Sequence, residues 1–151
     1  MKSTKNIARL AGASLLVLGL GTASAQAGTL LGLTADNKLV MIDTGTMSAS
    51  TPTAISDAGK VVGIDVRPAD GKLYGLTENG QLVTIDHKSG KAMPGKMLSE
   101  KVALGTRPIV DFNPAADRLR IIANDGVSLR VNVDDGATTV DKPLNYDAMD
   151  A

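Results

Sequence analysis

The sequence predicts an all-β fold of repeated four-stranded antiparallel sheets, arranged like propeller blades and left open or incomplete. Two observations predict it. Short β-type segments alternate with turn residues throughout the chain after residue 27, and whole segments recur at offsets of 43 and 46 residues. A period of about 40 to 50 residues is typical of propeller blades with four strands each. No segment after residue 27 shows the apolar periodicity of a helix.

The repeat is clearest where a strand is followed by a proline turn. Residues 65–73 are DVRPADGKL and residues 111–119 are DFNPAADRL, so Asp, Pro, Ala and Leu recur at an offset of 46. Upstream, residues 32–43 (GLTADNKLVMID) match residues 75–86 (GLTENGQLVTID) at an offset of 43. These matches define units at approximately 29–57, 60–98 and 108–142, and the first unit lacks its leading strand. The total is about 2.75 blades, whereas closed propellers use at least four.

The first 27 residues have the three parts of a secretory signal peptide. Lys2, Lys5 and Arg9 form the positive region, residues 10–20 are apolar, and residues 23–27 (ASAQA) hold two small-residue cleavage signals. The 11-residue apolar run is too short to span a bilayer as a helix. We therefore predict a signal peptide at 1–27 and a single β-repeat domain at 28–151. We expect no membrane span after cleavage, and a secreted or periplasmic location.

Ten segments have strand character and are bounded by turn residues. They are residues 29–34, 38–43, 60–67, 72–77, 81–86, 91–98, 108–113, 118–123, 128–133 and 137–142. Residues 48–57 are rich in Ser, Thr and Pro and predict a poor outer strand or a loop, and residues 99–107 predict a polar linker. Asn79-Gly80 predicts a hairpin with a type I′ turn, which requires positive φ at both residues. Pro94-Gly95 suits an edge strand or a break.

Composition limits the partners and the core. Removing residues 1–27 takes away three positive charges and no acidic ones, which leaves 13 Lys and Arg against 16 Asp and Glu. A mildly acidic chain argues against a nucleic-acid partner, because that binding needs a basic patch. The chain has no Cys, so disulfides cannot stabilise it. With one Phe, two Tyr and no Trp, the core must be aliphatic.

Four polar residues are the candidate ligand-binding set. Asp65 and Arg67 are two residues apart on one predicted strand and therefore share a face, and Asp111 and Asn113 hold the equivalent places in the next unit. On the innermost strand of a blade, their carboxylates and amide would lie near the central axis and bind a cation or a small polar ligand. The alternative is structural, with each Asp accepting nearby backbone N–H groups or pairing with a neighbour.

The acidic turns and the single histidine are weak evidence for calcium binding or catalysis. Asp134-Asp135-Gly136 and Asp125-Gly126 lack the spacing of a dedicated calcium loop and are typical of hairpin turns. His87, the single histidine, lies in a predicted turn without a recognisable nucleophile motif. We therefore predict no catalytic residue, no metal ligand set and no cofactor.

Several of these motifs resemble a known family. Residues 63–68 (GIDVRP), 73–76 (LYGL), 82–86 (LVTID), 111–114 (DFNP), 129–132 (LRVN) and 144–146 (LNY) are similar to the repeats of the secreted bacterial family called domain of unknown function 4394. The resemblance covers essentially residues 30–146. It implies a propeller-like fold and export but no activity. Because members of the family are usually longer, the chain resembles the N-terminal part of the domain.

Two functions remain open. The first is an exported, non-enzymatic β-repeat protein that binds an unknown protein or a cell-envelope glycan through its sheet edges or a blade face. Self-association through sheet edges belongs to this hypothesis, because open edges favour strand pairing. The second is a hydrolase similar to propeller lactonases, with a metal held near the axis by Asp65, Asp111 and Asn113. Those three ligands are few for a metal cage, so we expect a non-enzyme.

Overall fold

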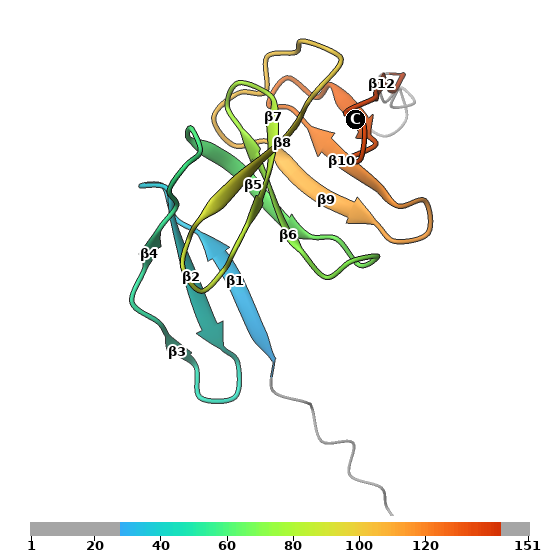
Figure 1. The fold of residues 1–151 in the computed structure, drawn as a ribbon. Helices are drawn as coiled ribbons and strands as arrows, with labels where there is room; N and C mark the ends of the chain where they lie inside the picture. The colour runs from blue at the N-terminus through green and yellow to red at the C-terminus, as the bar shows by residue number, and fades with distance from the viewer. Residues whose placement is uncertain (1–27, 143–151) are drawn as a thin grey trace, which may run out of the picture.

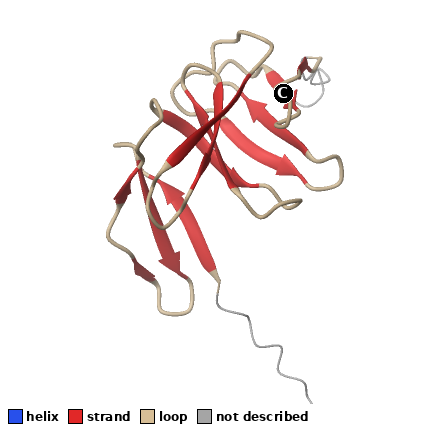
Figure 2. Ribbon diagram, in the orientation of Figure 1, coloured by secondary structure: helices blue, strands red, loops and turns tan. Residues whose placement is uncertain are grey.

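The computed structural model describes residues 28–142, and the predicted signal peptide lies outside the described residues. Twelve strands form three antiparallel sheets there, and none of the described residues is helical (Figures 1 and 2). The predicted all-β, propeller-like and open architecture is confirmed. The strands are β1 (Thr29–Leu33), β2 (Lys38–Asp43), β3 (Ser48–Ala49), β4 (Thr53–Ala54), β5 (Val61–Val66), β6 (Leu73–Thr77), β7 (Gln81–Ile85), β8 (Ala92–Met97), β9 (Ile109–Asn113), β10 (Arg118–Ile122), β11 (Ser128–Val131) and β12 (Thr138–Val140). The described residues include no helix that could cross a membrane.

Each sheet follows the chain as a meander. The second sheet has the order β5-β6-β7-β8 and the third β9-β10-β11-β12. In the first sheet, β1 pairs with β2, and the short strands β3 and β4 pair with the other edge of β2. Residues 48–57 therefore supply two strand fragments separated by residues 50–52. By the repeat offsets, β1 corresponds to β6 and β10, so no described strand of the first sheet corresponds to β5 or β9.

Three equivalent hairpins join the central strands. Asn37, Gly80 and Gly126 all have positive φ, at 62°, 80° and 87°. The N–H of Gly80 donates to the carbonyl of Thr77 at 2.9 Å, which closes a three-residue loop with glycine in the left-handed region. Asn79 is not among the residues with positive φ. The Asn-Gly hairpin is thus confirmed, but its predicted type I′ geometry is wrong.

Two apolar layers hold the sheets face to face. Between the first and second sheets lie Leu39, Ile55, Val61, Leu73, Val83, Ile85 and Ala92. Between the second and third lie Tyr74, Leu76, Leu82, Leu98, Leu104, Phe112, Leu119, Ile121, Leu129, Val131 and Val133. Two aromatic residues meet in the second layer, while the rest is aliphatic, as the composition predicts. Leu104 shows that the predicted polar linker at 99–107 also contributes to the core.

The second and third sheets come closest at their first strands, β5 and β9. A Cβ on Gly63 would clash with the side chain of Val110. Glycine at this point leaves the space that the Val110 side chain fills, so a larger residue would require Val110 to move. The contact lies near the candidate ligand-binding residues, two residues before Asp65 on β5 and one before Asp111 on β9.

Candidate functional site

The structure turns Asp65 and Arg67 toward the third sheet. Asp65 lies opposite Tyr74 in the β5–β6 register, on the face that packs against β9. Its Oδ2 accepts the backbone N–H of Phe112 at 2.6 Å. The carboxylate thus pairs with an N–H of the neighbouring sheet instead of one in its own proline turn. One carboxylate oxygen of Asp65 thus accepts a hydrogen bond from the protein itself, and ligand binding by this residue stays a prediction.

Arg67 links three turns. Its Nε and Nη2 donate to the two carboxylate oxygens of Asp117 at 2.9 and 2.6 Å. Nη1 and Nη2 donate to the two oxygens of Asp134 at 2.8 and 3.0 Å. The guanidinium also lies 6.0 Å from the ring centroid of Tyr74, and Asp70 is 3.6 Å from Nη1. We call this group of Arg67, Asp117 and Asp134 the arginine clamp.

The hydrogen bonds of the clamp favour its ionised form against the effect of burial. Arg67 is only 8% exposed. Hydrogen bonds from Arg67 hold the pKa values of Asp117 and Asp134 below their usual range. The same bonds raise the pKa of Arg67 and outweigh the opposing effect of its burial. Planar, bidentate pairing of this kind fixes geometry as well as charge, so the clamp ties the second sheet to two turns of the third.

Asp111 and Asn113 do not join this arrangement. The amide oxygen of Asn113 accepts the N–H groups of Ala115 and Ala116 at 3.0 and 3.2 Å, which caps its own turn. Asp111 is exposed and lies opposite Arg120 in the β9–β10 register, on the face of the third sheet that points away from the second. The structure therefore brings together Asp65 and Arg67, but not all four predicted residues. No three His, Cys, Asp or Glu side chains between residues 28 and 142 are placed to hold a metal ion.

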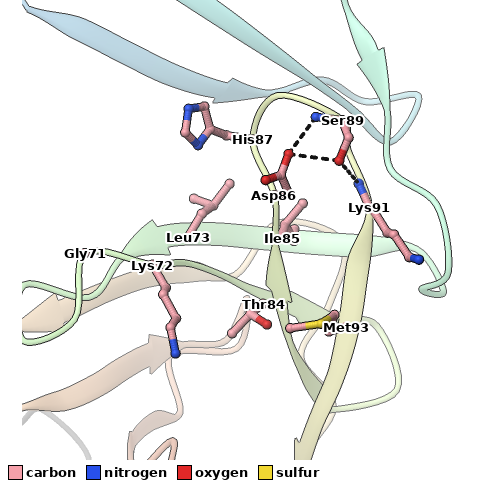
Figure 3. Close-up of a pocket in the computed structure, with 10 residues that line it drawn as sticks. All are labelled: Gly71, Lys72, Leu73, Thr84, Ile85, Asp86, His87, Ser89, Lys91 and Met93. Carbon is pink, nitrogen blue, oxygen red and sulfur yellow. Dashed lines mark hydrogen bonds between the residues drawn. The ribbon is translucent and has the colours of Figure 1, made fainter.

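A separate cavity of about 520 Å³ lies at the end of the second sheet, where β6 begins and β7 ends (Figure 3). Lys72, Leu73 and Ile85 line it together with residues of the β7–β8 turn. Met93, which is 63% exposed, completes one side. The cavity thus combines buried apolar side chains with lysine amines and an exposed thioether.

The polar groups of the β7–β8 turn form hydrogen bonds with one another. Asp86 Oδ1 accepts the backbone N–H and the hydroxyl of Ser89, both at 2.8 Å, and the N–H of Lys88 at 3.1 Å. The N–H and hydroxyl of Ser89 hold the pKa of Asp86 below its usual range. Figure 3 shows the ring of His87 apart from this pair. Since the serine proton goes to Asp86, the cluster is a capped turn and not a nucleophile with its base.

A family model described as "Domain of unknown function (DUF4394)" matches residues 38–151. The chain belongs to the DUF4394 family. The resemblance drawn from the repeated motifs is therefore confirmed. No curated protein matches the sequence.

Solved structures resemble the fold of this DUF4394 chain. A protein of unknown function from Bacteroides thetaiotaomicron matches with a TM-score of 0.60 and 14% identity, over 79% of this chain and 31% of its own. Hydrazine synthase from Kuenenia stuttgartiensis matches with a TM-score of 0.43 and 10% identity, over 82% and 38%. The chain thus spans about a third of the length of these structures. At 14% identity the first match supports the fold alone.

Sequence reasoning missed both the arginine clamp and the cavity of this DUF4394 chain. Asp117 and Asp134 are 50 and 67 residues from Arg67, so no local motif connects them. One signal was present. Asp117 occupies the position of Gly71 in the repeat, and both have positive φ, at 48° and 68°. Asp adopts the left-handed region more readily than most residues, so its side chain at a position that another unit gives to glycine is a candidate for a contact outside the turn.

Proposed function

We propose that this chain is an exported, non-enzymatic interaction module of the cell envelope that binds another protein. The observation that carries the proposal is the cavity at the end of the second sheet together with the exposed strand β8 beside it. Met93 and Met97 of β8 are 63% and 53% exposed. Methionine is common at protein-binding surfaces because its flexible, polarisable side chain adapts to varied partners.

The composition of the cavity supports a protein partner. Its apolar side chains, Leu73 and Ile85, suit an apolar side chain of the partner, and Lys72 and Lys91 suit polar or acidic groups around it. An apolar centre with a polar rim is the usual arrangement of a protein interface. Export rests on the charge and apolar pattern of residues 1–27.

The hydrolase alternative would require Asp65, Asp111 and Asn113 to converge on one metal ion. Asp65 and Asn113 accept backbone N–H groups, and Asp111 lies on the opposite face of the third sheet from the β5 contact. No observation favours this alternative, so we do not propose it.

The proposal is tested by photo-crosslinking in intact cells. A photoreactive phenylalanine analogue replaces Met93, and the same analogue at the exposed Arg118 of β10 is the control. We expect a protease-sensitive adduct of higher mass from position 93 and none from position 118. N-terminal sequencing of the adduct should begin at Gly28 or Gln26. A protease-resistant adduct that a glycosidase removes, or no adduct at position 93, would overturn the protein-binding proposal.

A further inference from the structure

Within residues 28–142, β1 is an edge strand of the first sheet, and it lies beside the second sheet (Figure 1). The equivalent strands of the other two sheets, β6 and β10, are not at an edge, because each pairs with one further antiparallel strand, β5 or β9. No strand within residues 28–142 covers β1 in this way. β5 and β9 are therefore two examples of the strand that would pair with β1.

The backbone of β1 presents unpaired groups along this edge. The N–H of Thr44 donates to the carbonyl of Gly28 at 2.9 Å, in register with the β1–β2 ladder. In an antiparallel ladder every second residue points its N–H and C=O at the partner strand. Residues 28, 30 and 32 therefore bond β2, and Thr29, Leu31 and Leu33 direct their N–H and C=O groups away from it. Their equivalents in β6 are the residues that bond β5.

Hollows line the same edge. A cavity of about 270 Å³ lies between Thr29–Leu31 and Ile64–Val66. A second, of about 700 Å³, lies between residues 33–35 and residues 60–64, and Ile64 lines both. Space is thus present along β1 and against β5, where a leading strand of the first sheet would lie.

The packing of equivalent residues also indicates a missing strand. Phe112 and Val66 occupy the same repeat position, near the end of β9 and β5. Phe112, packed beside β5, is 4% exposed, whereas Val66, which has no equivalent strand beside it in the described part of the chain, is 41% exposed. The equivalent position is buried in the third unit, so the exposed apolar side chain of Val66 marks a surface that binds a further segment.

The repeat also specifies a polar contact. Asp65 of β5 accepts the N–H of Phe112, the residue equivalent to Val66. The N–H of Arg67 donates to Lys72, so the adjacent residue, Val66, points its own N–H away from β6 and toward the vacant position. A strand that carried an Asp opposite Leu31 would accept this N–H as Asp65 accepts its counterpart.

We propose that the edge of β1 is a strand-acceptor site. It takes an extended segment of a partner protein, antiparallel to β1, with the apolar residues and single Asp of β5 and β9. Main-chain hydrogen bonds give such strand addition its affinity, and alternate side chains give it specificity. Leu73 lines both the smaller hollow and the cavity at Lys72 and Met93, but the backbone edge of β1 is not part of that cavity. Strand binding at β1 can therefore fail while the proposed function holds, and the reverse.

A nine-residue peptide with the sequence of residues 60–68 (KVVGIDVRP) is the probe. Two N-methylated forms of it have equal mass and charge. Methyl groups at the positions of Gly63 and Asp65 block the N–H groups that would face β1, whereas methyl groups at Ile64 and Val66 block those facing away. Affinity for the exported protein is measured by fluorescence anisotropy, and amide exchange is followed by NMR.

We expect the peptide methylated at Gly63 and Asp65 to bind at least tenfold more weakly than the other form. Binding of the unmodified peptide should slow exchange at the amides of Thr29, Leu31 and Leu33 and leave Leu30 and Gly32 unchanged, because the latter already bond β2. A peptide with Ala in place of Asp65 should bind more weakly and leave the Val66 amide unprotected. Equal affinities of the two methylated forms, protection of another edge, or a dimer of the chain that already protects the β1 amides would overturn the proposal.

Discussion

The arginine clamp gives the most direct test of how the second and third sheets are held together. Replacing Arg67 with Met keeps most of the stem and removes the guanidinium. The change eliminates four hydrogen bonds to the carboxylates of Asp117 and Asp134. Each hydrogen bond to a charged group contributes about 1.5 to 3 kcal/mol, and breaking a fully buried ion pair costs about 3 to 5 kcal/mol.

The loss of stability caused by Arg67→Met should be smaller than the value for a fully buried ion pair. The side chains of Asp117 and Asp134 are 38% and 64% exposed, so water rehydrates both carboxylates when the guanidinium is gone. We expect Arg67→Met to lower the free energy of unfolding by about 2 kcal/mol. For a domain of this size, that corresponds to a thermal midpoint lower by about 8 °C. Arg67→Lys should lose nearly as much, since one ammonium cannot reproduce two bidentate pairs.

Urea unfolding of the purified protein measures the effect. Arg118→Met is the matched control, because exposed Arg118 donates only to the backbone carbonyls of Ala116 and Asp117. We expect this control to change the free energy of unfolding by no more than about 0.5 kcal/mol. If Arg67→Met were no more destabilising than Arg118→Met, the clamp would not hold the sheets together.

The pH dependence gives an independent check. Because the folded state lowers the pKa values of Asp117 and Asp134 from 3.8, their contribution is present above that value. It is lost as the pH falls through the lowered folded values. The difference in stability between wild type and Arg67→Met should therefore be constant near neutral pH and shrink below pH 3.8. A difference that grew toward low pH would contradict the assigned ion pairs.

Three further substitutions test the turns and the contact between β5 and β9. Gly80→Val should destabilise the protein by about 1 to 3 kcal/mol, because valine is strained at a φ of 80°; an unchanged thermal midpoint would contradict that backbone geometry. Gly63→Val should cost about 2 kcal/mol or more through overpacking against Val110, and Val110→Ala in the same chain should recover part of the loss. Asp65→Ala should cost about 1 to 3 kcal/mol because it leaves a buried N–H unpaired, whereas Asp111→Ala should be nearly neutral. Equal losses at the two aspartates would mean that Asp111 has a partner we have not assigned.

The repeat alone predicted matching roles for Asp65 and Asp111, and the structure separates them. Their local sequences are alike, so both end the first strand of a unit with a side chain on the same face. Within residues 28–142, only Asp65 has another sheet on that face, and the N–H of Phe112 comes from that sheet. Local sequence determines where a side chain points, but the neighbouring sheet determines what it contacts.

Much of the fold followed from the sequence because its signals are local. Alternating apolar residues, turn residues and the offsets of 43 and 46 were enough to predict three antiparallel sheets and a first sheet without its leading strand. The resemblance of the repeated motifs to the DUF4394 family predicted the membership that the family model shows. Turn type was less accessible. Asn-Gly is compatible with several loops, and the three-residue loop closed by Thr77 was formed instead of the two-residue turn.

What only the tertiary structure decided are the contacts between units. Arg67 meets carboxylates 50 and 67 residues away because the stacking of two sheets brings three turns together. Leu104 enters the core from a segment without strand character, and no described strand pairs with the edge of β1 beside β5. Hydrogen bonding between consecutive strands of a hairpin and side-chain alternation depend on residues close together in the sequence, so the local sequence determines them. Stacking distance and burial depend on what the rest of the chain places opposite each residue.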